Sequence, residues 1–474
     1  MPTRARVTIV DVDDPNRASG RIRRLLPVLV LLCAILQGGA VVGIARVLDD
    51  PTPAAAPGLR EAAAPSTSPS PPQDADEQRA NARRVAIAAL LERRAGAFLS
   101  RDRAAFAGTL DPLAADFRRT QASVFDNVAE VPFAGWEYEI VTPDAFDLPA
   151  SRAAALDTVT FTAQVDLLYR ITGHDAAPVR VAQYLTFVLR DGAWYVAADT
   201  DGAGAGLRSP PQLWDLGPVS VVQGTHSIVM GIGSRDVLRV FARDADAAVP
   251  TVSAMWGAGW PGRAVVVVPA TLTQMAGLLG AEPDKYARIA AVTTGERGAS
   301  ASAAAADRVV VNPDAFRELG DLERSVVMVH EITHVASRAS TRAWTPTWLS
   351  EGFADYIGYL DSGQTMRTAA PELRRDVKAG KVPTALPDDT AFETTRPDLP
   401  QAYEMGWLAC RLIAEQWGAD RLVELYRAVG AEPAPGVGPP DATSALASAM
   451  VSVLGTDTDT FTDTWIDYLR TQAG

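Results

Sequence analysis

The stretch His330-Glu331-Ile332-Thr333-His334 holds two of the four histidines of this chain. On an α-helix, residues i and i+4 lie on one face, so both imidazoles can bind one cation while Glu331 points toward a water on that cation. Zinc suits such nitrogen ligands, and its catalytic sites combine three protein ligands with one open position. A water held there has a pKa of about 7, so hydroxide is available at neutral pH. The spacing therefore predicts a Zn²⁺ site that activates water.

Two imidazoles leave this site one ligand short, and Glu351 lies where a second helix can return to the first. Thr345 is the predicted N-cap of that helix, and Pro346 is its predicted first residue. Asp355 follows Glu351 by four residues and falls on the same face, where its carboxylate can accept the spare ring N–H of a ligand histidine. The sequence thus supplies a third ligand and a group to orient one of the histidines.

The combination of His330-Glu331-x-x-His334 with Glu351-x-x-x-Asp355, inside Trp-Leu-Ser-Glu-Gly-Phe-Ala, resembles the gluzincin zinc metallopeptidases, especially the aminopeptidase N and thermolysin-like group. The resemblance covers about residues 208 to 474, and the short motif supplies most of it. It implies that His330, His334 and Glu351 bind Zn²⁺. It further implies that Glu331 is the general base and that Asp355 orients His330.

Tyr403 stands in Gln-Ala-Tyr-Glu-Met-Gly-Trp, which resembles the Tyr-x-x-Gly helix start of the aminopeptidase N family. Peptide hydrolysis forms an oxyanion that needs an electrophile besides zinc, and the resemblance implies that Tyr403 supplies it. A tyrosine packed at a helix start for structural reasons is the alternative. The chain lacks the Gly-x-Met-Glu-Asn stretch with which that family grips the free amino terminus of a substrate. This departure argues against exopeptidase activity.

The N-terminal part predicts a membrane anchor and a linker. Residues 25–45 carry no formal charge and are long enough to span a bilayer. Six arginines precede them, whereas acidic residues follow soon after, so the positive-inside rule keeps the basic arm of residues 1–24 in the cytoplasm. Residues 46–80 are rich in Pro, Ala and Ser and read as a linker. We expect a single-pass protein whose catalytic part faces outward, with a cleaved signal peptide as the alternative.

Residues 81–206 combine a helical pattern with three later alternating segments, at 158–169, 179–189 and 192–197. A helix followed by a curved antiparallel sheet resembles the nuclear transport factor two-like domains, which have a cone-like α+β fold. Because such domains serve many purposes, the resemblance alone assigns no activity. We expect a substrate-docking or assembly role, with an inert spacer as the alternative.

Residues 207–474 predict a peptidase domain with a sheet lobe, a helical lobe and a cleft between them. Strands are predicted at 220–232, 264–269, 289–294 and 308–311, and a helix at 271–279. Later helices are predicted at 422–428, 443–454 and 461–471. A sheet edge beside the metal helix would accept an extended peptide as a further strand. The expected fold class of the whole chain is α+β.

Composition narrows the choice of function. The net charge of −13 and the lack of a basic cluster after the N-terminal arm argue against nucleic acid as a partner. With two cysteines in 474 residues, an exported domain without disulfides fits a bacterial cell envelope. The leading prediction is a membrane-anchored, extracytoplasmic zinc metallopeptidase acting on peptides or proteins. Two alternatives remain: a non-catalytic cell-envelope binding or assembly protein with a structural metal helix, and a zinc hydrolase for a non-peptide amide or ester.

Overall fold

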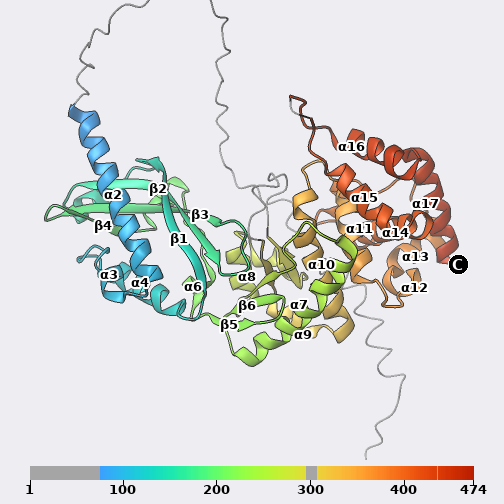
Figure 1. The fold of residues 1–474 in the computed structure, drawn as a ribbon, viewed down its shortest axis with the longest axis horizontal. Helices are drawn as coiled ribbons and strands as arrows, with labels where there is room; N and C mark the ends of the chain where they lie inside the picture. Colours follow the sequence, from blue (N-terminus) through green and yellow to red (C-terminus); the bar gives the residue numbers. More distant parts are fainter. Residues whose placement is uncertain (1–74, 295–306, 435) are drawn as a thin grey trace, which may run out of the picture.

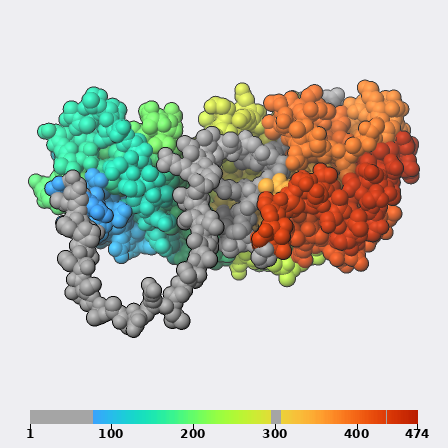
Figure 2. Space-filling model, turned by 90° about the horizontal axis from the view of Figure 1, so that it is seen from above, coloured from blue at the N-terminus to red at the C-terminus, as the bar shows by residue number. Residues whose placement is uncertain are grey.

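The structure is a computed structural model that describes residues 75–294, 307–434 and 436–474. It is a mixed α+β fold with two sheets, and the second sheet lies between the first and a set of C-terminal helices (Figure 1). Seen from above, the N-terminal part and the C-terminal helices occupy opposite ends of the molecule (Figure 2). The predicted arm 1–24 and membrane helix 25–45 lie outside the described residues. Within the described ranges, no helix combines the length and the apolar character needed to cross a bilayer.

The first sheet is antiparallel, with the strand order β1-β2-β3-β4. Its strands are β1 (Phe133–Pro143), β2 (Thr160–Ile171), β3 (Val179–Arg190) and β4 (Ala193–Ala198). The helices around it are α2 (Ala75–Leu99), α3 (Arg103–Ala107), α4 (Ala115–Asn127) and α5 (Ala150–Leu156), followed by the 3-10 helix η1 (Asp201–Ala205). The three strands predicted after residue 157 are confirmed within a few residues. The predicted linker is too long at its C-terminal end, because α2 already begins at Ala75.

Helix α2 covers the first sheet with a periodic apolar face. Ile87, Leu90 and Leu91 are buried against Phe161 and Phe187 of the sheet. The 3.6-residue period of this face is the signal that predicted a helix here. A helix packed on a four-stranded antiparallel sheet agrees with the predicted α+β class, while the assignment to a nuclear transport factor two-like domain stays a prediction.

The second sheet is mixed, with the order β5-β6-β7-β9-β8. Its strands are β5 (Ser220–Gln223), β6 (Ser227–Gly231), β7 (Ala264–Val268), β8 (Ala291–Thr293) and β9 (Val309–Val311). Strands β6, β7 and β9 run parallel, and the edge strands β5 and β8 are antiparallel to their neighbours. The predicted strand 220–232 is wrong as a single strand, because the chain turns between Gln223 and Ser227. The carboxylate of Asp246 accepts hydrogen bonds from the backbone N–H groups of this turn.

Helix α7 (Arg235–Trp256) connects the parallel strands β6 and β7 and packs against α10 (Asp321–Ser337), the helix that carries His330 and His334. It was not predicted, although its buried residues recur at helical spacing, as Leu238, Phe241, Ala245 and Val249 show. Pro250 lies inside it and interrupts the sequence signal for a continuous helix. The crossover between two parallel strands requires such a connection.

The remaining elements are mostly helices. They are α6 (Leu213–Leu216), α8 (Leu272–Leu278), η2 (Pro283–Tyr286), α9 (Pro313–Glu318), α10 (Asp321–Ser337), η4 (Arg338–Ser340), α11 (Thr347–Gly358), α12 (Met366–Ala369), α13 (Pro371–Lys378), η5 (Asp389–Phe392), α14 (Leu399–Trp417), α15 (Ala419–Val429), α16 (Ala442–Ala449), the π-helix η6 (Met450–Leu454) and α17 (Thr458–Ala473). The helices predicted at 271–279, 422–428, 443–454 and 461–471 are confirmed. A sheet part followed by a helical part therefore agrees with the expected arrangement of this half.

A buried contact joins the part of the chain that contains the first sheet to the part that contains the second sheet and the C-terminal helices. Trp214 of α6 packs its ring against Phe133, Trp136 and Tyr169 of the first sheet. Beside them, the guanidinium of Arg308 forms two hydrogen bonds of 2.7 Å with the carboxylate of Asp175, from the turn after β2. Aromatic packing thus joins the first sheet to α6, and a buried bidentate ion pair joins the turn after β2 to the residue that precedes β9.

Candidate metal centre

The metal helix α10 is buried on nearly all sides, between α7, α11 and strand β8. Val326, Val327 and Met328 belong to the apolar core, so packing fixes the position of this helix. His330 and Glu331 are fully buried, and His334 is 9% exposed. Imidazole and carboxylate groups in such a place need partners, because burying an unsatisfied polar or charged group costs several kcal/mol.

The second helix, α11, begins at Thr347, and Pro346 is its N-cap. The prediction that Thr345 caps this helix is wrong, because the Thr345 hydroxyl accepts a hydrogen bond from the backbone N–H of Arg342 instead. The carboxylate of Asp389, from η5, accepts the N–H of Thr347 at 2.8 Å. A side chain from far along the sequence therefore accepts one of the backbone N–H groups that a helix start leaves without an intrahelical partner, and Glu351 falls on the second turn as expected.

Helix α14 crosses α11 next to Glu351, and two glycines allow the close approach. A Cβ added at Gly352 would lie 2.2 Å from the carbonyl oxygen of Gly406, and one added at Gly406 would lie 2.8 Å from the carbonyl oxygen of Trp348. Any other residue at Gly352 would force the two backbones apart. The crossing therefore fixes the helix that presents Glu351 and Asp355.

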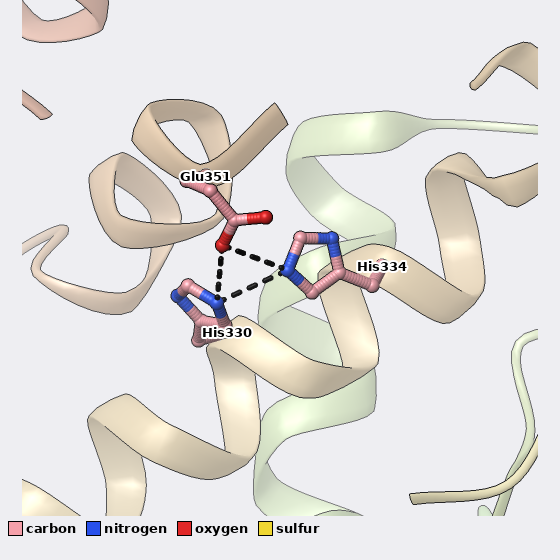
Figure 3. Close-up of side chains that lie close together, drawn as sticks. All are labelled: His330, His334 and Glu351. Carbon is pink, nitrogen blue, oxygen red and sulfur yellow. Dashed lines mark hydrogen bonds and ion pairs between the residues drawn. The ribbon is translucent and has the colours of Figure 1, made fainter. Parts of the chain in front are cut away.

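The structure brings His330, His334 and Glu351 together, with two side chains from α10 and one from α11 (Figure 3). The Nε2 atoms of the histidines lie 3.0 Å apart, and Oε2 of Glu351 lies 3.4 Å from Nε2 of His330 and 3.5 Å from Nε2 of His334. A tetrahedral zinc with ligands at about 2.0–2.2 Å separates those ligand atoms by about 3.3–3.6 Å. The two distances to Glu351 match these separations, and the distance between the histidine nitrogens is slightly shorter, so the triangle suits zinc in its ligand chemistry and approximately in its size.

Asp355 stands behind the first histidine, as the sequence predicted. Its Oδ1 lies 2.8 Å from Nδ1 of His330, and both groups are buried. A proton on Nδ1 that binds this carboxylate leaves Nε2, the atom that faces Glu351, with its lone pair free for a metal. One hydrogen bond thus selects both the tautomer and the orientation of the ring.

Burial and mutual attraction shift the ionisation of this cluster. Burial favours neutral His330, but the carboxylates of Asp355, Glu351 and Glu331 outweigh it and raise its pKa well above 6.5. Burial also favours the neutral form of Glu351, yet the two imidazoles outweigh it and lower the pKa of that carboxyl. Burial raises the pKa of Glu331 and of Asp355. The carboxyl groups thus hold a proton on His330 in the metal-free cluster, and a divalent cation would take the place of that proton.

Glu331 lies one residue beyond His330, and its two carboxylate oxygens have different surroundings. Oε2 accepts a hydrogen bond of 2.7 Å from the hydroxyl of Thr293, at the end of β8. Oε1 is buried and has no hydrogen-bond partner among the residues that the structure describes. A buried acceptor without a protein partner can accept a hydrogen bond from a water molecule at the proposed metal site. Sequence reasoning did not single out Thr293, because its contact with Glu331 arises only in the folded chain.

Tyr403 lies on α14, three residues before the crossing glycine, and is 1% exposed. Its ring meets that of Phe392 edge-on, with 5.2 Å between the ring centroids. Phe392 belongs to η5, the element that also caps α11 through Asp389. Tyr403 is thus buried beside the second metal-site helix, and its role in stabilising an oxyanion stays a prediction.

The other two histidines lie elsewhere. His174 is in the turn after β2, where its Nδ1 lies 3.1 Å from the carbonyl oxygen of Thr172. His226 precedes β6 and binds Asp246 through its backbone N–H. Within the described part of the chain, the one group of His, Cys, Asp and Glu side chains close enough to hold a metal is His330, His334 and Glu351.

No family model matches this chain, and no curated protein matches its sequence. Solved structures with some likeness include a two-domain M1 zinc metallopeptidase mutant bound to L-arginine, with 15% identity and a TM-score of 0.30 over 59% of this chain. This chain spans only 58% of the length of that protein. Two structures of an M1 zinc metallopeptidase mutant from Deinococcus radiodurans, one bound to a Tyr-Ser-Ala substrate, show 16% identity and a TM-score of 0.30 over 71% of each chain. Such low scores decide neither fold nor activity, so the functional argument rests on the geometry of the metal centre.

Proposed function

We propose that this chain is a zinc-dependent metallopeptidase that hydrolyses peptide bonds with water. The observation that supports it best is the buried triangle of His330, His334 and Glu351, whose ligand atoms lie 3.0–3.5 Å apart. A structural zinc site would be closed by four protein ligands. Among the described residues this group supplies three, and it stands next to Glu331, one of whose carboxylate oxygens has no hydrogen-bond partner there.

Zinc bound by these residues would supply a Lewis acid that polarises a carbonyl and lowers the pKa of water toward about 7. The residues of the chain perform the remaining tasks. Oε1 of Glu331 takes the proton from the attacking water and later delivers it to the leaving amine. Asp355 keeps His330 in the tautomer that can bind the metal. Tyr403 is proposed to donate its hydroxyl proton in a hydrogen bond to the oxyanion.

The proposed substrate is a peptide in extended conformation. Strand β8 lies at one edge of the second sheet and carries Thr293, which contacts Glu331. An extended peptide that pairs with such an edge satisfies its own backbone hydrogen bonds and lies beside the metal helix. This arrangement supports cleavage within a chain, and the missing Gly-x-Met-Glu-Asn stretch argues against dependence on a free amino terminus.

The proposed location is the outer face of a bacterial cell membrane, with residues 25–45 as the anchor and residues 1–24 in the cytoplasm. The support is the uncharged length of that stretch and the arginines before it. Fractionation of cells that make the full chain, followed by protease treatment of intact cells, tests this location. Recovery in the cytoplasmic fraction would contradict it.

The decisive experiment measures zinc content and peptide cleavage on the same full-length preparation. We expect about one zinc per chain, its loss in His334→Ala, and cleavage of a mixed peptide library. Glu331→Gln should retain zinc and lose cleavage, because the amide cannot accept the proton of water. Glu318→Gln changes an exposed glutamate near α10 and serves as the matched control.

The outcomes separate the alternatives. Zinc binding without hydrolysis of any peptide, amide or ester would favour a non-catalytic envelope protein with a structural metal helix. Hydrolysis confined to non-peptide amides or esters would favour the other alternative, a zinc hydrolase that does not act on peptides. Retained hydrolysis in Glu331→Gln would refute the assigned general base.

A further inference from the structure

We propose that Thr293 is the positioning residue of Glu331: its hydroxyl holds Oε2 and so reserves Oε1 for the proton of the attacking water. The proposal rests on the proposed peptidase function. It adds a residue that no motif contains and assigns different tasks to the two oxygens of one carboxylate.

The contact is short and buried on both sides. Oγ1 of Thr293 lies 2.7 Å from Oε2 and 3.0 Å from the backbone oxygen of Glu331. Thr293 is 5% exposed and Glu331 is fully buried. A hydroxyl has one proton, and the shorter contact with a charged acceptor is the stronger one. The hydroxyl therefore donates to Oε2, and the backbone oxygen keeps its place in the helix.

The residue type at this position is informative. Strand β8 reads Ala-Val-Thr, all three residues are buried, and the strand pairs with Val309 to Val311 of β9. Valine would fill the same volume as Thr293 without adding a polar atom to an apolar strand. The hydroxyl removes an unsatisfied acceptor from a carboxylate that lies deep in the protein, where such an acceptor is costly.

Fixing Oε2 has a direct chemical consequence. A carboxylate held by one oxygen can rotate less, so Oε1 keeps one orientation. The proton of water then forms a bond to Oε1 while the water O–H bond breaks and the oxygen attacks the carbonyl carbon. The same proton passes to the amide nitrogen as the C–N bond breaks. Strand β8 would thereby position both the general base and the paired substrate.

The test compares three variants of the full chain. Thr293→Val removes the hydroxyl and keeps nearly the same side-chain shape, whereas Thr293→Ser keeps a hydroxyl. Thr294→Val is the control: it removes the hydroxyl of the next residue, which accepts a hydrogen bond from the backbone N–H of Arg308. We expect Thr293→Val to lower kcat by about 10- to 100-fold at unchanged KM and zinc content. Thr293→Ser should recover most of the rate, and Thr294→Val should keep it.

Crystal structures of the metal-free proteins supply a readout that does not depend on turnover. We expect the Glu331 carboxylate to have a single conformation in the wild-type protein and in Thr293→Ser. In Thr293→Val it should be shifted or occupy two alternate conformations. An unchanged kcat in Thr293→Val, or an unchanged Glu331 orientation, would overturn the proposal. Failure of the peptidase proposal itself is recognised separately, by zinc-loaded wild-type protein that cleaves no peptide.

Discussion

Oδ1 of Asp355 lies 2.8 Å from Nδ1 of His330, and the two residues come from different helices, α11 and α10. The same pair of helices supplies the three proposed ligands. The hydrogen bond therefore does two things at once: it fixes the ring of one ligand, and it ties the helix of the third ligand to the helix of the first two. Metal affinity and the packing of these helices depend on each other.

Asp355→Ala should weaken zinc binding by about 10- to 100-fold, because His330 loses the acceptor that fixes its tautomer. Competition with a chromogenic chelator measures this affinity. Asp463→Ala, at an exposed position of α17, is the control and should bind zinc like the wild-type protein. Equal affinities in the two variants would show that Asp355 does not orient the ligand.

Gly352→Ala should destabilise the protein by about 1–3 kcal/mol or more, because the added Cβ meets the carbonyl oxygen of Gly406 at 2.2 Å. The atoms of Gly406 that the added Cβ meets belong to the backbone, so no side chain can rotate away to make room. Gly277→Ala is the matched control, since that glycine also lies inside a helix but has no atom within 4 Å of an added Cβ. It should be neutral or stabilising by up to about 1 kcal/mol. Urea denaturation of both variants measures the difference, and similar midpoints would contradict the tight crossing.

The clustering of His330, His334 and Glu351 was largely predictable from sequence because most of its geometry is local. His330 and His334 share a face through helical periodicity, and Glu351 and Asp355 share one for the same reason. The groups that complete the site come from far along the chain. Asp389 caps α11 across 42 residues, and Thr293 reaches Glu331 across 38 residues. No periodicity or spacing encodes such contacts, since they depend on how the sheet and the helices pack.

Zinc affinity should rise with pH above the ordinary pKa of histidine. In the metal-free protein, burial disfavours charged His330, but Asp355, Glu351 and Glu331 outweigh it and raise its pKa well above 6.5. A raised pKa means that protonated His330 stabilises the metal-free fold fully below pH 6.5 and that this stabilisation is lost as pH rises through the folded-state value. Zinc needs the neutral ring, so zinc binding releases a proton at every pH below the pKa of His330 in the folded protein. In that range the dissociation constant for zinc falls about tenfold per pH unit for each proton released.

Chelator competition at several pH values from 6.5 upward measures this dependence, and calorimetry in two buffers with different ionisation enthalpies counts the released protons. Asp355→Asn is the informative control, because without that carboxylate the pKa of His330 is lower and the pH dependence above 6.5 should be weaker. The same steep dependence in both proteins would exclude Asp355 as a major cause of the raised pKa.

Tyr403→Phe should lower kcat by about 100-fold if its hydroxyl stabilises the oxyanion, while zinc content stays unchanged. Phenylalanine keeps the ring that packs against Phe392, and thermal denaturation of the variant measures any effect on folding separately from kcat. Tyr468→Phe removes a hydroxyl that binds Glu415 on the surface and is the matched control. Unchanged turnover in Tyr403→Phe would remove this residue from the mechanism and leave it a core tyrosine.

Asp175→Ala should destabilise the whole described chain by about 3–5 kcal/mol, because it leaves the buried guanidinium of Arg308 without the carboxylate that binds it twice. The two side chains are 7% and 1% exposed, so water cannot replace the lost partner easily. Asp126→Ala breaks an ion pair with Arg103 whose side chains are 57% and 58% exposed, and it should cost less than about 1 kcal/mol.

Adding Arg308→Met to Asp175→Ala should recover part of the loss, since the double variant removes both charges of the buried pair. Denaturation followed by tryptophan fluorescence and by circular dichroism measures both the stability and its cooperativity. Because this ion pair joins the turn after β2 to the residue before β9, we expect the wild-type protein to unfold in one transition and Asp175→Ala to approach two. A single, unshifted transition in Asp175→Ala would show that the aromatic cluster around Trp214 couples the two halves without help from the ion pair.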